Sequence, residues 1–148
     1  KALYQELQLL SQKHLIHASL YENITLARQG NHIESLQEIL DSLDLADWNR
    51  SLPEGLSTIL SLDVPGLSQS KTVQILIARA CFLKPQVLIV GQTLDQLPKE
   101  KQRKALAALK KHSPHTVVIV LSSEWRNGTT GFATTIDLPT DPNGGEHV

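Results

Sequence analysis

Lys71 and Thr72 stand at the start of an apolar segment, after the turn-rich stretch that opens DVPGLSQSKTVQILIARA, residues 63–80. A lysine followed by a hydroxyl residue ends the phosphate-binding loop G-x-x-x-x-G-K-[ST], whose glycines let backbone N–H groups approach phosphate oxygens closely. Here Ser70 and Pro65 occupy the two glycine positions, and Gly66 comes one place too late. We therefore do not expect this stretch to work as such a loop.

The composition limits the kinds of protein to consider. The 148 residues are 41% hydrophobic and 20% charged, with a formal net charge of -1. These values are typical of one globular domain with a real core, and they give no charge excess that would attract nucleic acid. The single cysteine, Cys81, lies in an apolar run and is expected to pack in the core. Because the chain starts at Lys1 and contains no methionine, we expect it to be a fragment that continues upstream.

A first helix is predicted from Asn31 to Leu45. Asn31 is placed to cap it, and Glu34 three residues later would complete a capping box. Its apolar residues recur at helical spacing, at Ile33, Leu36, Leu40 and Leu43.

A strand–helix–strand unit is predicted in the second half. The segment Ser68–Cys81 is apolar all round and indicates a buried helix. The β-branched runs at 87–90 and 117–121 are typical of central parallel strands that are covered on both faces. Between them a helix would have Pro98 in its first turn and would end at Lys110 and Lys111. The expected fold class is therefore α/β with parallel strands.

The segments, in this order, resemble the nucleotide-binding domain of ABC transporters, most closely its exporter-type branch. The stretch at 67–80 matches the signature LSGGQ-x-Q-R-x-x-I-A-R-A without a gap, with Leu67 and Ser68 as its first two letters. LPEGLST at 52–58 is similar to the LPxGLxT segment, and the run at 87–90 takes the place of the Walker B strand. SQKHLIHASLYENITLA at 11–27 is similar to the Q-loop region.

The resemblance covers about residues 8–138 and implies the C-terminal portion of such a domain. The implied fold is a partial P-loop NTPase core with parallel strands plus an α-helical subdomain. Residues 1–85 would hold the Q-loop region and the helical subdomain with its signature-like helix. Residues 86–139 would form the second half of the α/β core, with the Walker B-like strand, the D-loop and the switch strand, and 140–148 would be a tail. The Walker A loop would lie before Lys1.

The resemblance also implies ligands and partners. ATP and Mg²⁺ would be the cofactors, and a second nucleotide-binding domain, in a homodimer or heterodimer, would face the signature loop. A transmembrane domain would be the other partner, which places the chain at the cytoplasmic face of the cell membrane. The implied nucleotide-binding residues are Gln12, Leu67, Ser68, Gln69, Ser70 and Lys71.

Several of these residues have a second interpretation. Ser68 either binds phosphate or only caps its helix, and Lys71 is either a phosphate contact or a solvated lysine of the first turn. Gln12 is either the coupling-loop glutamine or an ordinary polar residue. Trp48 and Trp125 are expected to be packing residues.

The departures from the family pattern fall on the chemical positions. Gly91 and Gln92 replace the Asp-Glu pair that ends the Walker B strand, and Ser122 replaces the switch histidine. Asp95-Gln96-Leu97-Pro98 has lost the last aspartate of the D-loop. Gln92 can orient a water but cannot take its proton, although general-base catalysis contributes about 10²–10⁴-fold. We therefore expect no catalytic residues and no ATP hydrolysis.

Two alternatives remain open at this point. The chain is either the degenerate half of a transporter, with Gln92 as a water-positioning remnant, or an interaction or scaffold module that works without nucleotide. A third interpretation, an active ATPase, would have to recruit Glu124 as its carboxylate.

Overall fold

Three parallel strands form the sheet of this protein. The structure is a computed structural model, and it describes residues 7–10 and 15–121. The strand order is β1-β2-β3, and Val87 pairs with Leu7 on one side and Val117 on the other. The strands are β1 (Leu7–Leu10), β2 (Val87–Val90) and β3 (Val117–Val120). The strands predicted at 87–90 and 117–121 are confirmed.

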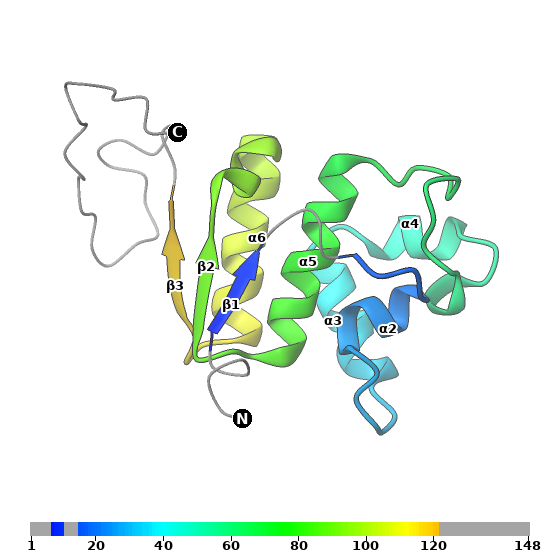
Figure 1. The fold of residues 1–148 in the computed structure, drawn as a ribbon, viewed down its shortest axis with the longest axis horizontal. Helices are drawn as coiled ribbons and strands as arrows, with labels where there is room; N and C mark the ends of the chain where they lie inside the picture. The colour runs from blue at the N-terminus through cyan, green and yellow to red at the C-terminus, as the bar shows by residue number, and fades with distance from the viewer. Residues whose placement is uncertain (1–6, 11–14, 122–148) are drawn as a thin grey trace, which may run out of the picture.

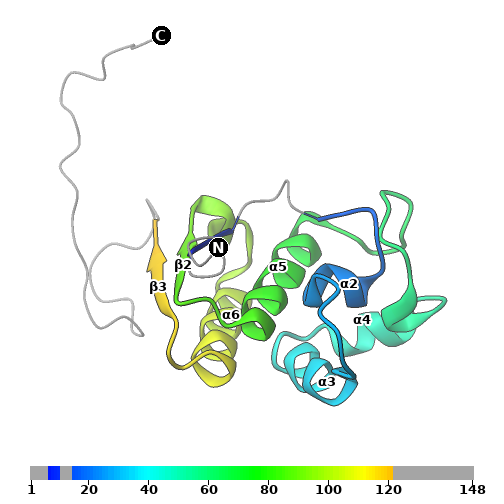
Figure 2. The same cartoon turned by 60° about the horizontal axis from the view of Figure 1, so that its bottom comes forward.

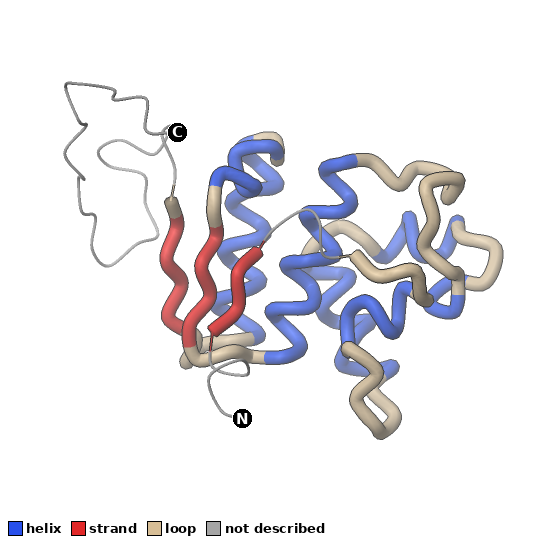
Figure 3. The backbone as a smooth tube through the Cα atoms, in the orientation of Figure 1, coloured by secondary structure: helices blue, strands red, loops and turns tan. Residues whose placement is uncertain are grey.

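The helix α5 (Gln69–Leu83) separates two groups of elements. On one side of it lie the sheet and α6 (Lys99–His112), and on the other lie the shorter helices (Figure 1, Figure 2). Those helices are α2 (Leu20–Thr25), α3 (Ile33–Ser42), α4 (Ala46–Ser51) and the 3₁₀ turn η2 (Gly55–Ser57). A further 3₁₀ turn, η3 (Gln92–Gln96), links β2 to α6. Figure 3 shows the strands gathered at one side of the molecule and the helical group at the other.

The core runs through α5, as its apolar sequence predicts. Every residue from Val73 to Cys81 is buried, because the helix has neighbours on all sides. Cys81 is fully buried, and burial raises the pKa of its thiol to about 12. The helix begins after Ser68, as predicted, and continues to Leu83, two residues beyond the predicted end.

The covering of β3 differs from the prediction. Val117 and Ile119 are exposed, at 58% and 43%, whereas Val118 and Val120 pack against the core. Within the described part of the chain β3 is an edge strand, and its outward face has no helix over it. An apolar run shows that a strand can be buried on both faces, but the neighbours that cover it come from elsewhere in the fold.

The first predicted helix is shorter than expected. Its N-cap is His32 rather than Asn31, and the predicted capping box is wrong. Asn31 Oδ1 accepts a hydrogen bond from the Ile33 N–H instead, at 3.2 Å. The helix α3 ends at Ser42 because Asp44 turns into the left-handed region, with φ 55°.

The apolar face of α3 also differs from the prediction. Ile33 is exposed, whereas Leu36, Ile39 and Leu40 are buried. In α6, Pro98 is the N-cap rather than a first-turn residue, and Lys110 and Lys111 close the last turn as predicted.

Candidate functional site

The signature-like loop and the end of β2 lie at the same end of the molecule. The strand β2 and helix α5 run in opposite directions, so the first turn of α5 and the last residues of β2 face the same way (Figure 1). The carboxyl ends of parallel strands are where α/β proteins bind their ligands. Ser68 at the start of α5 and Gly91 after β2 are therefore both at the end where chemistry is expected.

Ser68 is the N-cap of α5. Its Oγ accepts a hydrogen bond from the Lys71 N–H at 3.2 Å, and its carbonyl accepts one from the Thr72 N–H at 2.9 Å. Leu67 before it packs against the core, half-buried. The N-cap interpretation of Ser68 is confirmed, and this helix start presents N–H groups in the arrangement that favours an anion.

Trp48 of α4 holds this loop from the side. Its Nε1 donates a hydrogen bond to the Pro65 carbonyl at 3.0 Å. Gly66 has φ 73°, and a Cβ at this position would lie 3.1 Å from Trp48 Nε1, so only glycine fits without strain. The predicted packing role of Trp48 is confirmed, whereas its contact with the loop 17 residues later could not be predicted from the sequence.

Lys71 also contacts Trp48. Its Nζ lies 5.8 Å from the centroid of the indole ring, within the range of a cation–π interaction. Burial, together with the charge of Lys101, lowers the pKa of the Lys71 ammonium. Lys71 thus lies half-buried against an aromatic ring in the first turn of α5, and its contact with a phosphate stays a prediction.

The two residues that replace the signature glycines differ in their surroundings. Gln69 is exposed, whereas Ser70 is half-buried. Ser70 Oγ has no hydrogen-bond partner among the described residues, although it is shielded from solvent. Neither residue allows the close backbone approach that glycine would give.

Gly91 and Gln92 follow β2 directly. Gly91 is the N-cap of η3 and Gln92 its first residue, with an exposed side chain. A Cβ built on Gly91 would meet no atom within 4 Å, so a larger side chain has room here. The absence of a carboxylate at Gly91 is thus not a consequence of steric crowding.

The donors do not fit a magnesium ion. Gly91 supplies no side-chain oxygen, and hard cations such as Mg²⁺ are held in proteins mainly by carboxylates. Across residues 7–10 and 15–121 there is no group of three or more His, Cys, Asp or Glu side chains that could hold a metal ion.

Asn23, in the segment similar to the Q-loop region, and Arg79, in the signature-like stretch, are 56 positions apart and are brought together by the fold. The Asn23 amide donates to the carbonyls of Ile16, Ala18 and Ser19, and its Oδ1 accepts from the Ile16 N–H. Arg79 Nε donates to the Asn23 carbonyl at 2.7 Å. The segment that precedes α2 is therefore tied to the signature-like helix.

The segment before α2 has one further feature that sequence reasoning missed. Ser19 and Glu22 form a capping box, which the S-x-x-E spacing could have indicated. The backbone and hydroxyl of Ser19 both hydrogen-bond the Glu22 carboxylate and lower its pKa. Two predicted site residues, Gln12 and Ser122, lie outside the described residues, as do Glu124 and Trp125.

Comparisons with known proteins point to one group. No protein-family model matches the chain. The alpha-hemolysin translocation ATP-binding protein HlyB of Escherichia coli O157:H7 is 28% identical over 113 residues, which are 76% of this chain and 16% of that protein. The ATP-dependent lipid A-core flippase of Vibrio cholerae is 26% identical over 122 residues, 81% of this chain and 21% of that protein.

A third relative and a solved structure agree with these two. The uncharacterized ABC transporter ATP-binding protein YfiB of Bacillus subtilis is 30% identical over 108 residues, 71% of this chain and 18% of that protein. A bacterial Atm1-family ABC exporter with ATP bound has a similar fold, with a TM-score of 0.67, 21% identity, and coverage of 81% of this chain and 21% of that one.

The chain thus spans about a fifth or less of the length of these relatives. Among the helices that the structure describes, none combines the length and the apolar character needed to cross a membrane. The chain is a relative of ABC transporter ATP-binding proteins, as the order of its sequence motifs predicts.

Proposed function

We propose that this chain is part of a degenerate, non-hydrolytic nucleotide-binding half of an ABC-type transporter. In this role it would couple ATP-driven closure of a nucleotide-binding dimer to movement of a membrane domain. The observation that carries the proposal is the pair Gly91 and Gln92 at the carboxyl end of the central strand β2. Family relationship supports the transporter class, and the pair supports the loss of hydrolysis.

The chemical argument concerns what Gly91 and Gln92 cannot do. Phosphoryl transfer depends almost entirely on positioning and on stabilising charge. A glycine gives no oxygen to a metal ion, and a glutamine amide cannot accept the proton of an attacking water. Because a Cβ at Gly91 would meet no atom within 4 Å, steric crowding does not account for the glycine at this position.

The proposed architecture follows the motif order. Residues 1–85 would belong to the Q-loop region and helical subdomain, 86–139 to the second half of a P-loop NTPase core, and 140–148 to a tail. ATP would lie between this half and a second nucleotide-binding domain. The helix start at Ser68, which favours an anion, would face that nucleotide.

The coupling surface would lie around residues 13–24, on the cytoplasmic face of the cell membrane. A shallow hollow of about 570 Å³ opens beside α2. Ile16 and Ile59 at this part of the molecule are about half exposed. The hollow is lined by Ser19, Tyr21, Glu22, Ala27, Arg28, Gln29, Gly30, Ser57 and Ile59. Its mixed polar and apolar lining suits a protein segment from a membrane domain.

One observation favours a second candidate, a scaffold module that works without nucleotide. Lys71 is engaged by Trp48, and Gln69 and Ser70 replace the two glycines, so the helix start is poorer at holding phosphate than the family pattern. A module of this kind would keep the fold and its protein contacts while binding no ATP.

ATP binding by the full-length protein separates the two candidates. We expect ATP to bind, and to bind more tightly when the partner nucleotide-binding domain is present, because the site would be shared between two halves. Equilibrium binding of a fluorescent ATP analogue, alone and with the partner, measures this. Absence of binding under both conditions would contradict the transporter proposal and favour the scaffold. A Ser68→Ala variant should weaken only the partner-dependent part of the binding.

A further inference from the structure

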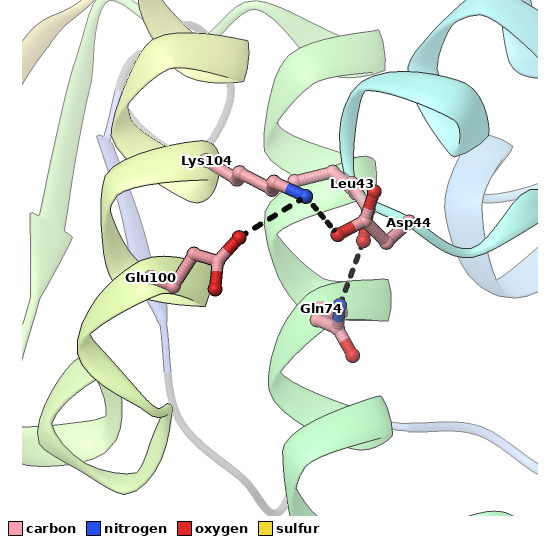
Figure 4. Close-up of polar contacts among 5 residues, drawn as sticks. All are labelled: Leu43, Asp44, Gln74, Glu100 and Lys104. Atoms are coloured by element: carbon pink, nitrogen blue, oxygen red, sulfur yellow. Dashed lines mark hydrogen bonds and ion pairs between the residues drawn. The ribbon is translucent and has the colours of Figure 1, made fainter.

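The carboxyl end of α3 is fastened to two other helices by three consecutive residues. Ser42 Oγ lies 2.9 Å from His112 Nε2 at the end of α6. The Leu43 carbonyl accepts a hydrogen bond from Gln74 Nε2 of α5 at 2.7 Å, and Asp44 Oδ2 accepts one from Lys104 Nζ of α6 at 2.6 Å. Figure 4 shows the second and third contacts side by side.

These contacts extend over a long part of α6. Lys104 and His112 are eight positions apart, about 12 Å along a helix at 1.5 Å per residue. Two contacts separated by two turns prevent α3 from pivoting about a single point on α6. The third contact, through Gln74, ties the same end of α3 to α5.

Asp44 occupies a backbone conformation that favours glycine. Its φ is 55°, in the left-handed region just after the helix C-cap, where glycine is the commonest residue. A side chain in this region strains the backbone, although aspartate tolerates it better than most residues. Since the carboxylate of Asp44 is ion-paired with Lys104, the side chain has a contact that glycine would lose.

Gln74 is an unusual residue for the middle of a buried helix. Its side chain is buried among apolar neighbours, and its Oε1 has no hydrogen-bond partner among the described residues. A buried amide is unfavourable unless its polar atoms are paired. The Gln74 amide donates a hydrogen bond to the Leu43 carbonyl. This carbonyl is one of the last of α3, which have no partner in their own helix.

We propose that this fastening, the α3 latch (Ser42, Leu43 and Asp44 with Gln74, Lys104 and His112), makes α3, α5 and α6 move as one rigid body. The helix α6 is in turn tied to the segment after β2, because Gln102 Nε2 donates to the Leu97 carbonyl at 2.8 Å. The purpose of the latch rests on the proposed function. A displacement at the coupling surface would reach the region of Gly91 instead of being absorbed between helices.

Hydrogen exchange on the full-length protein without nucleotide tests the latch. Lys104→Met removes the cation of the ion pair without altering the backbone of α3. Lys101→Met is the matched control, because Lys101 lies one turn earlier on α6 and is similarly half-buried, but makes no ion pair among the described residues. Asp44→Asn removes the other charge and keeps a residue that tolerates left-handed backbone, and Asp41→Asn is its control.

We expect Lys104→Met and Asp44→Asn each to speed exchange in residues 33–45 by about two- to fivefold, the range of one exposed ion pair. Lys104 Nζ also lies 3.7 Å from Glu100 Oε1, a contact that only Lys104→Met removes. The double variant should therefore be no faster than Lys104→Met alone, because that variant already removes the Asp44–Lys104 pair. Exchange equal to that of the Lys101→Met and Asp41→Asn controls, or strictly additive effects, would overturn the latch. Because no nucleotide is added, this result does not depend on whether the protein binds ATP.

Discussion

At the scale of single residues, two glycines of this chain stand at opposite extremes. Gly66 has φ 73° and faces Trp48 at 3.1 Å, whereas Gly91 has an ordinary backbone and open space around it. The first is required by the geometry of the loop before Ser68. The second is required by nothing in the described structure, which is why its place in the Walker B-like segment is informative.

The same substitution at these two positions should therefore have different effects on stability. We expect Gly66→Ala to lower the free energy of unfolding by about 1–2 kcal/mol, the range for a left-handed alanine, with more lost through contact with Trp48. Gly91→Ala should be neutral or raise stability slightly, because it restricts the unfolded chain. Urea denaturation of the full-length protein measures both. Similar losses for the two variants would show that the open space at Gly91 is misjudged.

At the scale of elements, the pairing of Asn23 with Arg79 connects the segment before α2 to the signature-like helix α5. The guanidinium is largely buried, and burial lowers the pKa of Arg79. The Asn23 amide and carbonyl thus join the loop before α2 to helix α5 through hydrogen bonds. This pairing fixes where the proposed coupling surface sits relative to the Ser68 loop.

Removing this pairing should destabilise the fold. Arg79→Met leaves the buried Asn23 carbonyl without its donor, and we expect a loss of about 1–3 kcal/mol in the free energy of unfolding, the range for an unsatisfied buried group. Arg103→Met, at an exposed arginine of α6, is the control and should change stability little. Equal denaturation midpoints for the two variants would contradict the structural role of Arg79.

The elements themselves could largely be predicted from the sequence. Helix α5 and strands β2 and β3 were predictable because continuous apolar runs and the cap at Ser68 are local signals. The start of α3 could not be predicted. Asn31 is a good capping residue, but it lies one position before the N-cap His32, where its side chain accepts a hydrogen bond from the Ile33 N–H. The exposure of Val117 and Ile119 depends on which elements cover β3, and no local pattern encodes that.

The candidate site likewise has residues that could be predicted from the sequence and contacts that could not. The motif letters placed Ser68, Gly91 and Gln92 at the ends of the right elements. The contacts of Trp48 with Pro65 and Lys71 could not be predicted, because they join α4 to a loop that follows it only after the intervening turn η2. Whether Gln12 and Ser122 act as predicted remains a prediction, since neither is among the described residues.

At the scale of the whole molecule, the elements that the motif order predicts are present, whereas Gly91 and Gln92 stand where the family pattern has carboxylates. The sheet, the buried helix α5 and the Asn23–Arg79 pairing all form. At Gly91, where the family pattern has an aspartate, a Cβ would meet no atom within 4 Å. The central claim is therefore that this half binds nucleotide without hydrolysing it.

Steady-state ATP hydrolysis by the full-length protein, free of its partner, tests this claim most directly, with the Gly91→Asp plus Gln92→Glu variant measured beside it. We predict that the wild-type protein gives no turnover above the blank. Restoring a general base should raise hydrolysis toward the detectable range, since such a base contributes about 10²–10⁴-fold. Robust turnover by the wild-type protein, unchanged in the double variant, would contradict the account and show that other residues carry the catalysis.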